Sequence, residues 1–353
     1  MRTDDFDYAL PAELIAQTPA EPRDSSRLLV VNRTTGELEH RHFHDIGDYL
    51  RAGDVLVLND SRVVPARLKG RRADTGGNVE ALLLRRSGEP DAWEALVKPA
   101  NRLRVGAHIL FDDQRDDSSV PAVITAALPE GTRVIAFPQG SSPEQMGAVP
   151  LPPYITAPLP DPERYQTVYA EEEGSAAAPT AGLHFTQRLL DELTAKGIDQ
   201  VRLTLHVGLD TFRPVRHDDP REHGIHQEFY RMSVDAASRL TRAALEGRRI
   251  VCVGTTSVRS IEDAVRRSGW RADVPRTEQP PVQPYEGMTG LYILPGHDFL
   301  AVDALITNFH LPRTTLLMLV SAFAGRERVL AAYEEAVRLR YRFYSFGDAL
   351  LFV

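Results

Sequence analysis

The chain has 353 residues, of which 42% are hydrophobic and 25% are charged, and its formal net charge is −8 at pH 7. This balance is typical of a globular protein, and the length predicts two domains. No segment approaches the roughly 18 uninterrupted apolar residues of a membrane helix, and the acidic N-terminus lacks the apolar core of a signal peptide. We therefore expect a cytoplasmic protein without a membrane span. The single cysteine, Cys252, excludes an internal disulfide and fits that compartment.

The first predicted element is a short apolar strand at residues 54–59, bounded by Gly53. A continuous apolar run of this length is typical of a strand that is buried on both faces. A polar cluster follows it at once, with Asn59, Asp60 and Arg62. A buried strand that ends in polar groups is a common place for a site in an α/β domain.

Residues 63–149 have a different texture, with short β-type runs separated by turn residues. The runs are 66–69, 79–86, 92–98, 107–111, 120–127 and 132–137. Their even spacing and the lack of a helical pattern predict a small antiparallel barrel or sandwich, inserted into a larger domain made of residues 1–62 and 150–353. Residues 61–110 carry a local charge of +5, which permits a phosphate-binding face on an acidic protein, although an ordinary solvated surface explains it equally well.

In the larger domain strands alternate with helices, which predicts an α/β fold. The expected elements are a helix at 186–196 capped by Thr186 and ended by Gly197, a strand at 201–207, a strand at 250–253 that leads through a turn into a helix reaching Arg266, a proline-rich loop or lid at 268–286, and helices at 314–323 and 326–339 separated by Gly325. The alternation in the strand at 201–207 places His206 with Arg202 and Thr204 on the polar side of a half-buried strand.

Four short segments carry histidines among Gly, Thr, Asn or Pro, as loops that present polar groups do. The histidines are His184, His206, His223 with His226, and His310. One interpretation is proton transfer and hydrogen bonding. The alternative is a metal-dependent hydrolase whose ligands come from His184, His206, His223 and His226 beside Glu228, but the spacing matches no strong metal signature, so we expect no metal. His40, His42 and His44 are interpreted as an exposed strand edge.

Two further groupings allow a functional and a structural interpretation. Thr255, Thr256 and Arg259 follow a strand, where they suit a carboxylate or phosphate near a helix N-terminus, or simply a capped helix. Tyr165 and Gln166 form a mixture suited to stacking on a base and hydrogen-bonding its edge, or to packing at a domain junction. A non-catalytic RNA-binding module is a third hypothesis, disfavoured because the polar motifs lie in the acidic part of the chain.

Short strings of high specificity run from residue 10 to the C-terminus. They are Leu10–Gln17, Ser26–Val30, Gly53–Asp60 with Arg62, Arg164–Tyr169, Ala177–Thr186 (AAPTAGLHFT), Thr204–Gly208 (TLHVG), Thr211–Val215, Val253–Arg259 (VGTTSVR), Ile306–Pro312 (ITNFHLP) and Ser345–Asp348. In this order they closely resemble the S-adenosylmethionine:tRNA ribosyltransferase-isomerases of queuosine biosynthesis. Asp210 departs from the family pattern, where Gly is common, and adds a carboxylate beside His206.

The resemblance implies a large α/β domain with a small inserted antiparallel β-barrel. It implies transfer of the ribosyl part of S-adenosylmethionine to 7-aminomethyl-7-deazaguanine at the wobble position of tRNAs for Asp, Asn, His and Tyr. Rearrangement then gives epoxyqueuosine, with adenine and methionine released. S-adenosylmethionine is a co-substrate in this scheme, no other cofactor or metal is expected, and the chain is expected to act as a monomer.

The matching positions supply the candidate residues. The catalytic candidates are His184, His206, His226 and His310, with His223 beside them, Glu228 orienting a histidine and Asp60 near the amine of the base. The substrate-binding candidates are Asn59, Arg62, Tyr165, Gln166, Thr180, Arg213, Thr255, Thr256, Arg259 and Asn308. We expect Tyr165 to stack on an extruded wobble base. The tRNA backbone is expected to contact Arg71, Arg72, Arg85 and Arg86 of the insert.

Overall fold

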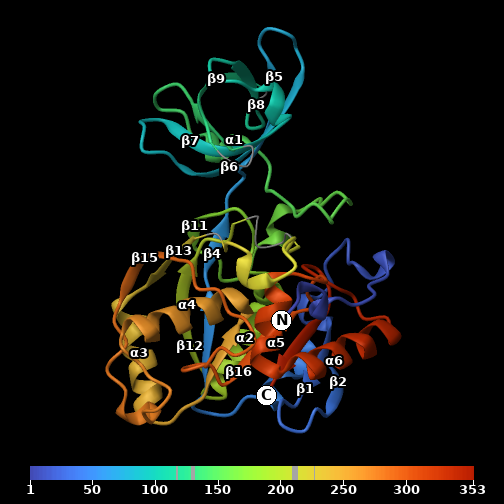
Figure 1. The fold of residues 1–353 in the computed structure, drawn as a ribbon, viewed down its shortest axis with the longest axis vertical. Coiled ribbons are helices and arrows are strands. Elements are labelled where there is room, and N and C mark those ends of the chain that lie inside the picture. The colour runs from blue at the N-terminus through green and yellow to red at the C-terminus, as the bar shows by residue number, and fades with distance from the viewer. Residues whose placement is uncertain (117, 129–131, 209–213, 226) are drawn as a thin grey trace. The chain divides into compact units, whose positions relative to one another are not determined.

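The computed structural model describes residues 1–116, 118–128, 132–208, 214–225 and 227–353 (Figure 1). The chain divides into two compact units. The first, here called the α/β unit, comprises residues 1–62, 152–172 and 178–353. The second, the barrel unit, comprises residues 63–151 and 173–177. The predicted fold class, a large α/β domain with a smaller inserted antiparallel β-barrel, is confirmed.

The α/β unit is built on a nine-stranded sheet. Its order is β15 (Tyr285–Thr289), β13 (Glu228–Met232), β12 (Asp199–Leu205), β3 (Val55–Asn59), β14 (Ile250–Val253), β16 (Ala304–Asn308), β17 (Ala349–Phe352), β1 (Arg27–Val31) and β2 (Leu38–His42). The four central strands β12, β3, β14 and β16 are mutually parallel. Their carboxyl ends therefore lie along one edge of the sheet, here called the carboxyl edge, and their amino ends along the opposite edge, the amino edge.

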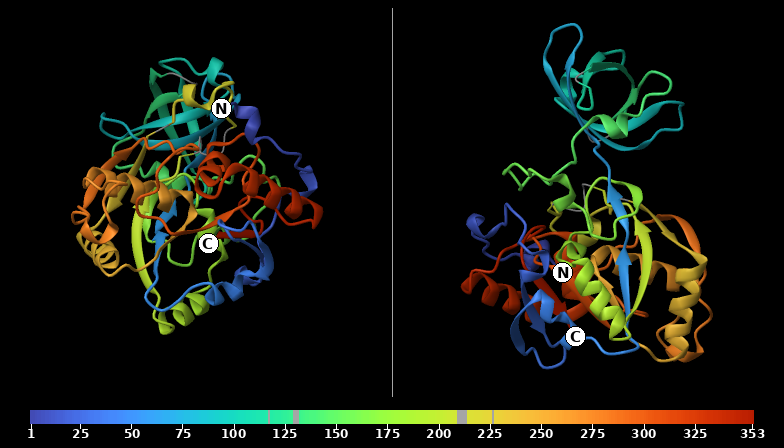
Figure 2. Two further views of the ribbon diagram at one scale, coloured as in Figure 1. Left: turned by 60° about the horizontal axis from the view of Figure 1, so that its bottom comes forward. Right: turned by 180° about the vertical axis from the view of Figure 1, so that it is seen from behind.

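Helices cover both faces of this sheet. The α-helices of the unit are α2 (Gln187–Ala195), α3 (Val234–Leu245), α4 (Gly254–Arg267), α5 (Thr315–Ala324) and α6 (Arg326–Arg338). Helices α4, α5 and α6 lie on the face toward the viewer in Figure 1, and α2 lies on the opposite face, which the right-hand view of Figure 2 brings forward. Because both faces are covered, all five residues of β3 are buried, as its continuous apolar sequence predicts.

Short 3-10 helices connect the larger elements. They are η1 (Thr3–Phe6), η2 (Ala12–Leu14), η3 (Arg23–Ser25), η4 (Phe43–Asp48), η5 (Ala100–Arg102), η7 (Pro162–Tyr165), η8 (Thr180–His184), η10 (Pro220–Glu222) and η11 (Arg276–Glu278). Among the residues that the structure describes, no helix combines the length and the apolar character needed to cross a membrane.

The ends of α2 follow the predicted signals. The hydroxyl of Thr186 accepts a hydrogen bond from the backbone N–H of Leu189 at 3.2 Å, and Gly197, just past the helix, has a φ of +85°. Leu189 and Leu193 are buried in the same core as Leu56 of β3. An amphipathic pattern with both caps thus fixes this helix on one face of the sheet.

The barrel unit is a closed six-stranded barrel in which every neighbouring pair is antiparallel. Its order is β10 (Thr132–Ala136), β7 (Ala92–Lys98), β6 (Asn78–Arg86), β5 (Arg67–Arg72), β8 (His108–Asp113) and β9 (Ser118–Ala127). Leu68, Ile109 and Phe111 are among the residues that fill its interior. The unit also holds α1 (Pro143–Met146), while β4 (Ser61–Val63) and β11 (Glu172–Ser175) form a separate two-stranded sheet.

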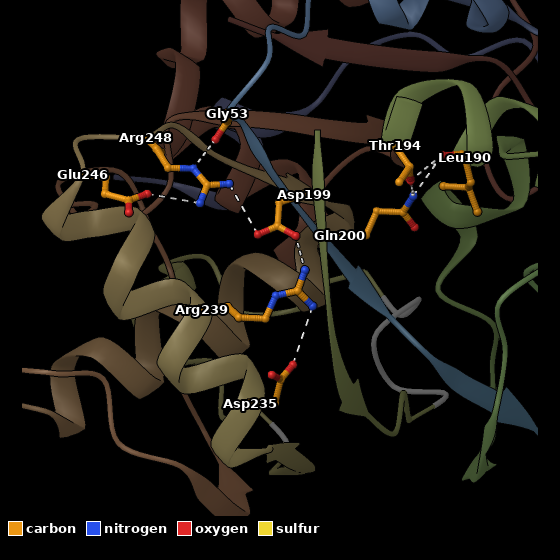
Figure 3. A network of polar contacts seen from close by, with 9 residues as sticks. All are labelled: Gly53, Leu190, Thr194, Asp199, Gln200, Asp235, Arg239, Glu246 and Arg248. Atoms are coloured by element: carbon orange, nitrogen blue, oxygen red, sulfur yellow. Dashed lines mark hydrogen bonds and ion pairs between the residues drawn. The ribbon is translucent and has the colours of Figure 1, made fainter. Parts of the chain in front are cut away.

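The amino edge of the large sheet is occupied by ion pairs (Figure 3). Asp199, the first residue of β12, contacts Arg239 of α3 and lies 3.4 Å from the Nη2 atom of Arg248. The guanidinium of Arg248 also donates to the carbonyl of Gly53. Beside them, Arg249 donates twice to the buried carboxylate of Asp54, which precedes β3. Charged groups at this edge therefore find partners within the protein.

The loop at 268–286, predicted as a loop or lid, is held at this amino edge. Arg276 in η11 donates to Asp303 at 2.6 Å, and Trp270 donates its indole N–H to the carbonyl of Pro280 at 2.8 Å. Because α4 runs from the carboxyl edge to the amino edge, the loop that follows it emerges on the far side of the sheet. The predicted loop is present and extends to β15, which begins at Tyr285, and its place at the amino edge gives the lid interpretation no support.

Candidate active site

The carboxyl edge of the large sheet brings together predicted residues that are far apart in the sequence. They are Asn59 and Asp60 at the end of β3, His206 after β12, Thr255, Thr256 and Arg259 in the helix that follows β14, Asn308 and His310 at the end of β16, and Glu228 at the start of β13. β13 runs antiparallel to β12 and so begins at the edge where β12 ends. The ends of parallel strands are where open α/β sheets place ligand sites.

His184 is the most enclosed of the predicted histidines. Its Nδ1 atom lies 2.8 Å from the hydroxyl of Ser26, and its Nε2 atom lies 2.9 Å from the amide nitrogen of Asn308. The ring stacks on Phe43 with a centroid distance of 5.0 Å. Burial, helped by the nearby charges of Arg342 and Arg23, lowers the pKa of His184 to about 3. The imidazole is therefore neutral near pH 7, and both its nitrogens are engaged within the protein.

His310 is buried as well, two residues after β16. Its Nε2 atom lies 3.0 Å from the hydroxyl of Thr307, its backbone N–H donates to Tyr333, and its carbonyl accepts from Tyr8. Burial lowers the pKa of His310 to about 3. These contacts hold the turn after β16, which carries Asn308, in place.

His206 differs from both. Its ring stacks on Phe229 at a centroid distance of 5.6 Å, and its Nδ1 atom is buried without a hydrogen-bond partner. Burial lowers the pKa of His206, an effect that the charge of Glu172 opposes and that of Arg231 assists. A neutral imidazole with a free ring nitrogen is chemically able to accept a proton or a substrate hydrogen bond.

The strand 201–207 is less exposed on its polar side than its alternation predicts. Thr204 is buried beside the end of β3, where its hydroxyl donates to the carboxylate of Asp60 at 2.7 Å. Burial raises the pKa of Asp60, with the hydrogen bond from Thr204 acting in the opposite direction. Alternation signals which face a side chain occupies, but it carries no information about a neighbouring strand end that covers that face.

Asn59 joins two strands where their pairing ends. Its carboxamide oxygen accepts from the backbone N–H groups of Ser61 and Leu205, and its nitrogen donates to the carbonyl of Leu205 and to the hydroxyl of Thr256. These contacts engage both the oxygen and the nitrogen of the carboxamide. The structure therefore places Asn59 as a brace beneath the site, and its predicted contact with substrate has no support from this geometry.

A buried ion pair lies between β13 and α4. Arg259 donates through Nη1 to Glu228 and through Nε to the carbonyl of Leu291, while its Nη2 atom is buried without a partner. The other oxygen of Glu228 accepts the backbone N–H of Gly208 at 2.9 Å. Glu228 thus fixes Arg259 and the end of the TLHVG segment. That it also orients a histidine stays a prediction.

β14 leads directly into α4 at this edge. β14 ends at Val253 and the helix begins at Gly254, whose φ of +85° is adopted more readily by glycine than by residues with a Cβ atom. Thr255 and Thr256 are buried in the first turn, and no side chain caps the helix. The N–H groups of a first turn favour an anion, so this corner is suited to a carboxylate or a phosphate.

Several buried polar atoms in the α/β unit lack a partner. Within the segments that form the carboxyl edge and the loop 152–172 they are Ser61 Oγ, the Tyr165 hydroxyl, Thr167 Oγ1, the Tyr169 hydroxyl, His206 Nδ1, Arg259 Nη2 and Asn308 Oδ1. A buried polar atom without a hydrogen bond costs roughly 1–3 kcal/mol, so native proteins keep few of them. Their concentration here indicates groups that are reserved for a ligand. Thr167, Ser61 and Ser26 are candidate site residues that the sequence did not single out, although each lies in or beside a family string. Tyr169 was considered there only as an aromatic residue suited to stacking.

The other predicted substrate residues differ in how far their side chains are engaged within the protein. Tyr165 is 0% exposed and packs edge-on against Phe346, so no face of its ring is open to a base, and the stacking prediction disagrees with the structure. Gln166 is buried, Thr180 is half-buried, and Arg62 pairs with Glu163. Aromatic residues beside Arg and Gln do not by themselves distinguish a stacking platform from a packed core. Asp210, Arg213 and His226 lie outside the described residues.

The predicted arginines of the barrel unit are not equally free. Arg71 is exposed, with its guanidinium 3.9 Å from Asp112. Arg72 pairs with Asp74 and donates to the carbonyl of Arg102. Arg86 pairs with Glu144 at 2.9 Å and lies over the ring of Trp93. The side chain of Arg85 is outside the described part of the chain.

The histidines do not assemble as a metal site in the described part of the chain. There, the only group with metal-ligand spacing is His42, His44 and Asp45, on the exposed side of β2 and η4. β2 is the edge strand of the sheet, as the interpretation of His40, His42 and His44 requires. His223 instead packs near His217 and Tyr292.

The carboxyl edge of this open α/β sheet brings together neutral histidines, a free guanidinium nitrogen and a buried carboxyl. These features define the class of the protein as a ligand-binding enzyme with an inserted barrel. The chain belongs to the queuosine biosynthesis protein family, whose model matches residues 3–352. It is 53% identical to the S-adenosylmethionine:tRNA ribosyltransferase-isomerase of Symbiobacterium thermophilum and 52% identical to that of Moorella thermoacetica, with 99% of each chain covered. It is also similar to a crystal structure of the S-adenosylmethionine tRNA ribosyltransferase of Thermotoga maritima, at 38% identity and a TM-score of 0.54, covering 99% of this chain and 100% of that one.

Proposed function

We propose that this chain transfers and isomerises the ribosyl part of S-adenosylmethionine onto 7-aminomethyl-7-deazaguanine at the wobble position of tRNA, in queuosine biosynthesis. The products are epoxyqueuosine in tRNA, adenine and methionine. Support comes from the names of relatives that match over the full chain. The hydrolase alternative has no such support, and its histidine cluster does not form among the described residues.

The observation that carries the assignment of the site is the set of buried, unpartnered polar atoms at the carboxyl edge. The reaction needs a base beside the sulfonium, a cation for the methionine carboxylate and a group that receives a proton from the ammonium of the modified base. His206, Arg259 and Asp60 supply these three properties from one edge of one sheet.

The chemistry assigns each of them a step. His206, neutral and with Nδ1 free, removes a proton from the ribose carbon beside the sulfonium, whose charge stabilises the carbanion. The Nη2 atom of Arg259 binds the methionine carboxylate. The electron pair of that carbanion breaks the bond between C4′ and the ring oxygen, and the freed oxygen becomes the C1′ aldehyde as adenine leaves with the proton that His206 took up. Burial raises the pKa of Asp60, which favours uptake of a proton from the aminomethyl ammonium, and the free amine then attacks C4′. The carbanion that re-forms beside the sulfonium adds to C1′, and the resulting alkoxide closes the epoxide and expels methionine.

We further propose that the barrel unit contacts the tRNA backbone and that the substrates are tRNAs for Asp, Asn, His and Tyr. The proposal extends to a monomer in the cytoplasm that needs no metal or other cofactor. Arg71, Arg72, Arg85 and Arg86 are the proposed phosphate contacts. Of the three whose side chains are described, Arg71 has the weakest contact within the protein. Its replacement is therefore expected to weaken tRNA binding the most.

The test of the activity is release of free adenine. The protein is incubated with S-adenosylmethionine and a tRNA that bears the aminomethyl base, and adenine is measured against the same tRNA bearing guanine. Adenine release that requires the modified base supports transfer. Release that proceeds equally without tRNA identifies a hydrolase, and binding of tRNA without release identifies an RNA-binding module.

The test of the tRNA surface is the salt dependence of binding. Replacing the four arginines together by alanine is expected to weaken binding and to flatten the slope of log Kd against log salt, because fewer counterions are released. A control variant changes Arg188, Arg202, Arg221 and Arg271 of the α/β unit to alanine. An unchanged slope in the barrel variant would place the tRNA contact elsewhere.

A further inference from the structure

The hydrogen bonds around His184 fix the orientation of the Asn308 carboxamide. The Nδ2 atom of Asn308 donates to the carbonyl of Tyr344 at 3.2 Å and lies 2.9 Å from His184 Nε2. A carbonyl only accepts, so the nitrogen of the carboxamide, and not its oxygen, must face Tyr344. The second hydrogen of that nitrogen then points to the ring of His184.

This orientation also fixes the tautomer of His184. Because Nε2 accepts a hydrogen bond from Asn308, it carries no proton, and in the neutral ring the proton is on Nδ1. Nδ1 lies 2.8 Å from the hydroxyl of Ser26, which accepts it. The lowered pKa of His184 agrees with a ring that stays neutral. Neither ring nitrogen is left to take a proton from a substrate.

The chain of contacts leaves one atom free. The Oδ1 atom of Asn308 is buried and has no hydrogen-bond partner, while Nδ2 uses both of its hydrogens. Asn308 is 3% exposed and is the last residue of β16, at the carboxyl edge. An acceptor that is desolvated and held in one orientation discriminates strongly for a ligand that offers an N–H or O–H there.

We infer that His184 is a positioning residue that holds the Asn308 carboxamide, and that Asn308 Oδ1 is the group that recognises a hydrogen-bond donor of the nucleoside. This deepens the proposed function and rests on it. The donors on the nucleoside part of S-adenosylmethionine are the amino group of adenine and the hydroxyls of the ribose. His184 is then no longer a candidate for proton transfer, whereas His206 remains one.

Two variants of His184 separate positioning from proton transfer. A glutamine side chain places a carbonyl near the position of Nε2, whereas an asparagine side chain reaches only the position of Nδ1. Positioning therefore predicts that His184→Gln keeps adenine release within about fivefold of the parent, and that His184→Asn loses about 10- to 100-fold, because a misplaced binding group costs up to that much. Equal losses in both variants, or no loss in either, would overturn the inference. Ser25→Ala is the control, since that hydroxyl donates only to the carbonyl of Pro22.

Substrate analogues identify the donor. S-adenosylmethionine analogues that lack the 6-amino group, the 2′-hydroxyl or the 3′-hydroxyl are compared in kcat/KM with the parent chain and with Asn308→Ala. One analogue is expected to be worse than S-adenosylmethionine by about tenfold or more in the parent, and that preference is expected to vanish in Asn308→Ala and to shrink in His184→Asn. If Asn308→Ala retains every preference, the recognition role is wrong.

A spectroscopic readout keeps the inference independent of the activity. In the full-length protein with ¹⁵N-labelled histidine, the ring of His184, assigned by its loss in His184→Gln, is expected to show a protonated Nδ1 and an unprotonated Nε2. The Asn308→Ala variant is expected to change the Nε2 signal. The opposite tautomer would overturn the positioning role even if adenine release is observed, and absence of adenine release with the expected tautomer would refute only the proposed function.

Discussion

The two edges of the large sheet differ in how fully their polar side chains are paired. At the amino edge Asp199 and Asp54 are paired with arginines, and these charged groups find partners within the protein. At the carboxyl edge His206 Nδ1, Arg259 Nη2 and Asn308 Oδ1 are buried without partners. The same strands supply both edges, so the difference does not come from strand packing.

The contrast separates stability from function along one set of strands. Paired charges at the amino edge contribute to the free energy of folding, whereas unpartnered groups at the carboxyl edge reduce it and are retained because a substrate uses them. Substitutions at the amino edge should therefore change stability and leave turnover intact. Substitutions that remove the unpartnered atoms at the carboxyl edge should change turnover and leave stability nearly intact.

The largest effect is expected for His206→Ala. If this ring removes the proton beside the sulfonium, turnover measured as adenine release should fall at least about 100-fold. The thermal midpoint shows that the variant is folded; any decrease comes from the lost stacking on Phe229, because Nδ1 has no hydrogen bond to lose. Near-parental turnover in a folded variant would remove His206 from the mechanism.

Asp54→Ala tests the opposite edge. Removal of this buried carboxylate leaves Arg249 without its ion-pair partner and is expected to lower the free energy of unfolding by about 3 kcal/mol. Denaturant unfolding measures the loss, and kcat should stay within about twofold of the parent. A variant that keeps its stability but loses turnover would contradict the assignment of stability to the amino edge and of function to the carboxyl edge.

The buried histidines predict a loss of stability in acid. Burial lowers the pKa of His310 to about 3, below the value of about 6.5 of the unfolded chain, so the unfolded state binds more protons between these values. The free energy of unfolding therefore falls as pH drops below about 6.5, by about 2 kcal/mol at pH 5 from this residue. His310→Gln removes that contribution. The variant should lose less stability than the parent between pH 7 and pH 5, and an equal loss in both would show that folding does not lower the pKa of His310.

The smallest effect is expected for Thr204→Val. The hydroxyl of Thr204 stabilises the ionised carboxylate of Asp60, so its removal should raise the pKa of Asp60 further. If the ionised form accepts the proton of the substrate ammonium, the acidic limb of the profile of kcat/KM against pH moves to higher pH. A limb that stays in place or moves to lower pH would exclude Asp60 as that group.

Local sequence signals predicted much of the fold. The caps of α2 and the strand pattern of the barrel gave their elements to within a few residues, since both depend on contacts close in sequence. No element was predicted for residues 228–245 or 304–308, which form β13, α3 and β16. The place of the loop 268–286 at the amino edge could not be predicted, because its hydrogen bond to Asp303 spans 27 residues of chain, which no local pattern encodes.

The sequence predicted which residues form the candidate site better than it predicted what each residue does there. Histidines and their polar neighbours indicated which segments meet, and the parallel strands bring His206, Arg259 and Asn308 to one edge. Roles depend on which atoms remain unpartnered, and that follows only from contacts such as those of Ser26 and Tyr344 with the His184–Asn308 pair. Tyr165 shows the same limit, since its burial against Phe346 cannot be inferred from its neighbours in sequence.

The most direct test of the account is an experimental structure of the full chain with S-adenosylmethionine bound. The account predicts a methionine carboxylate on Arg259 Nη2, a nucleoside donor on Asn308 Oδ1 and the ribose carbon beside the sulfonium within reach of His206 Nδ1. A nucleoside bound at any other place, with these three atoms still unpartnered, would contradict it.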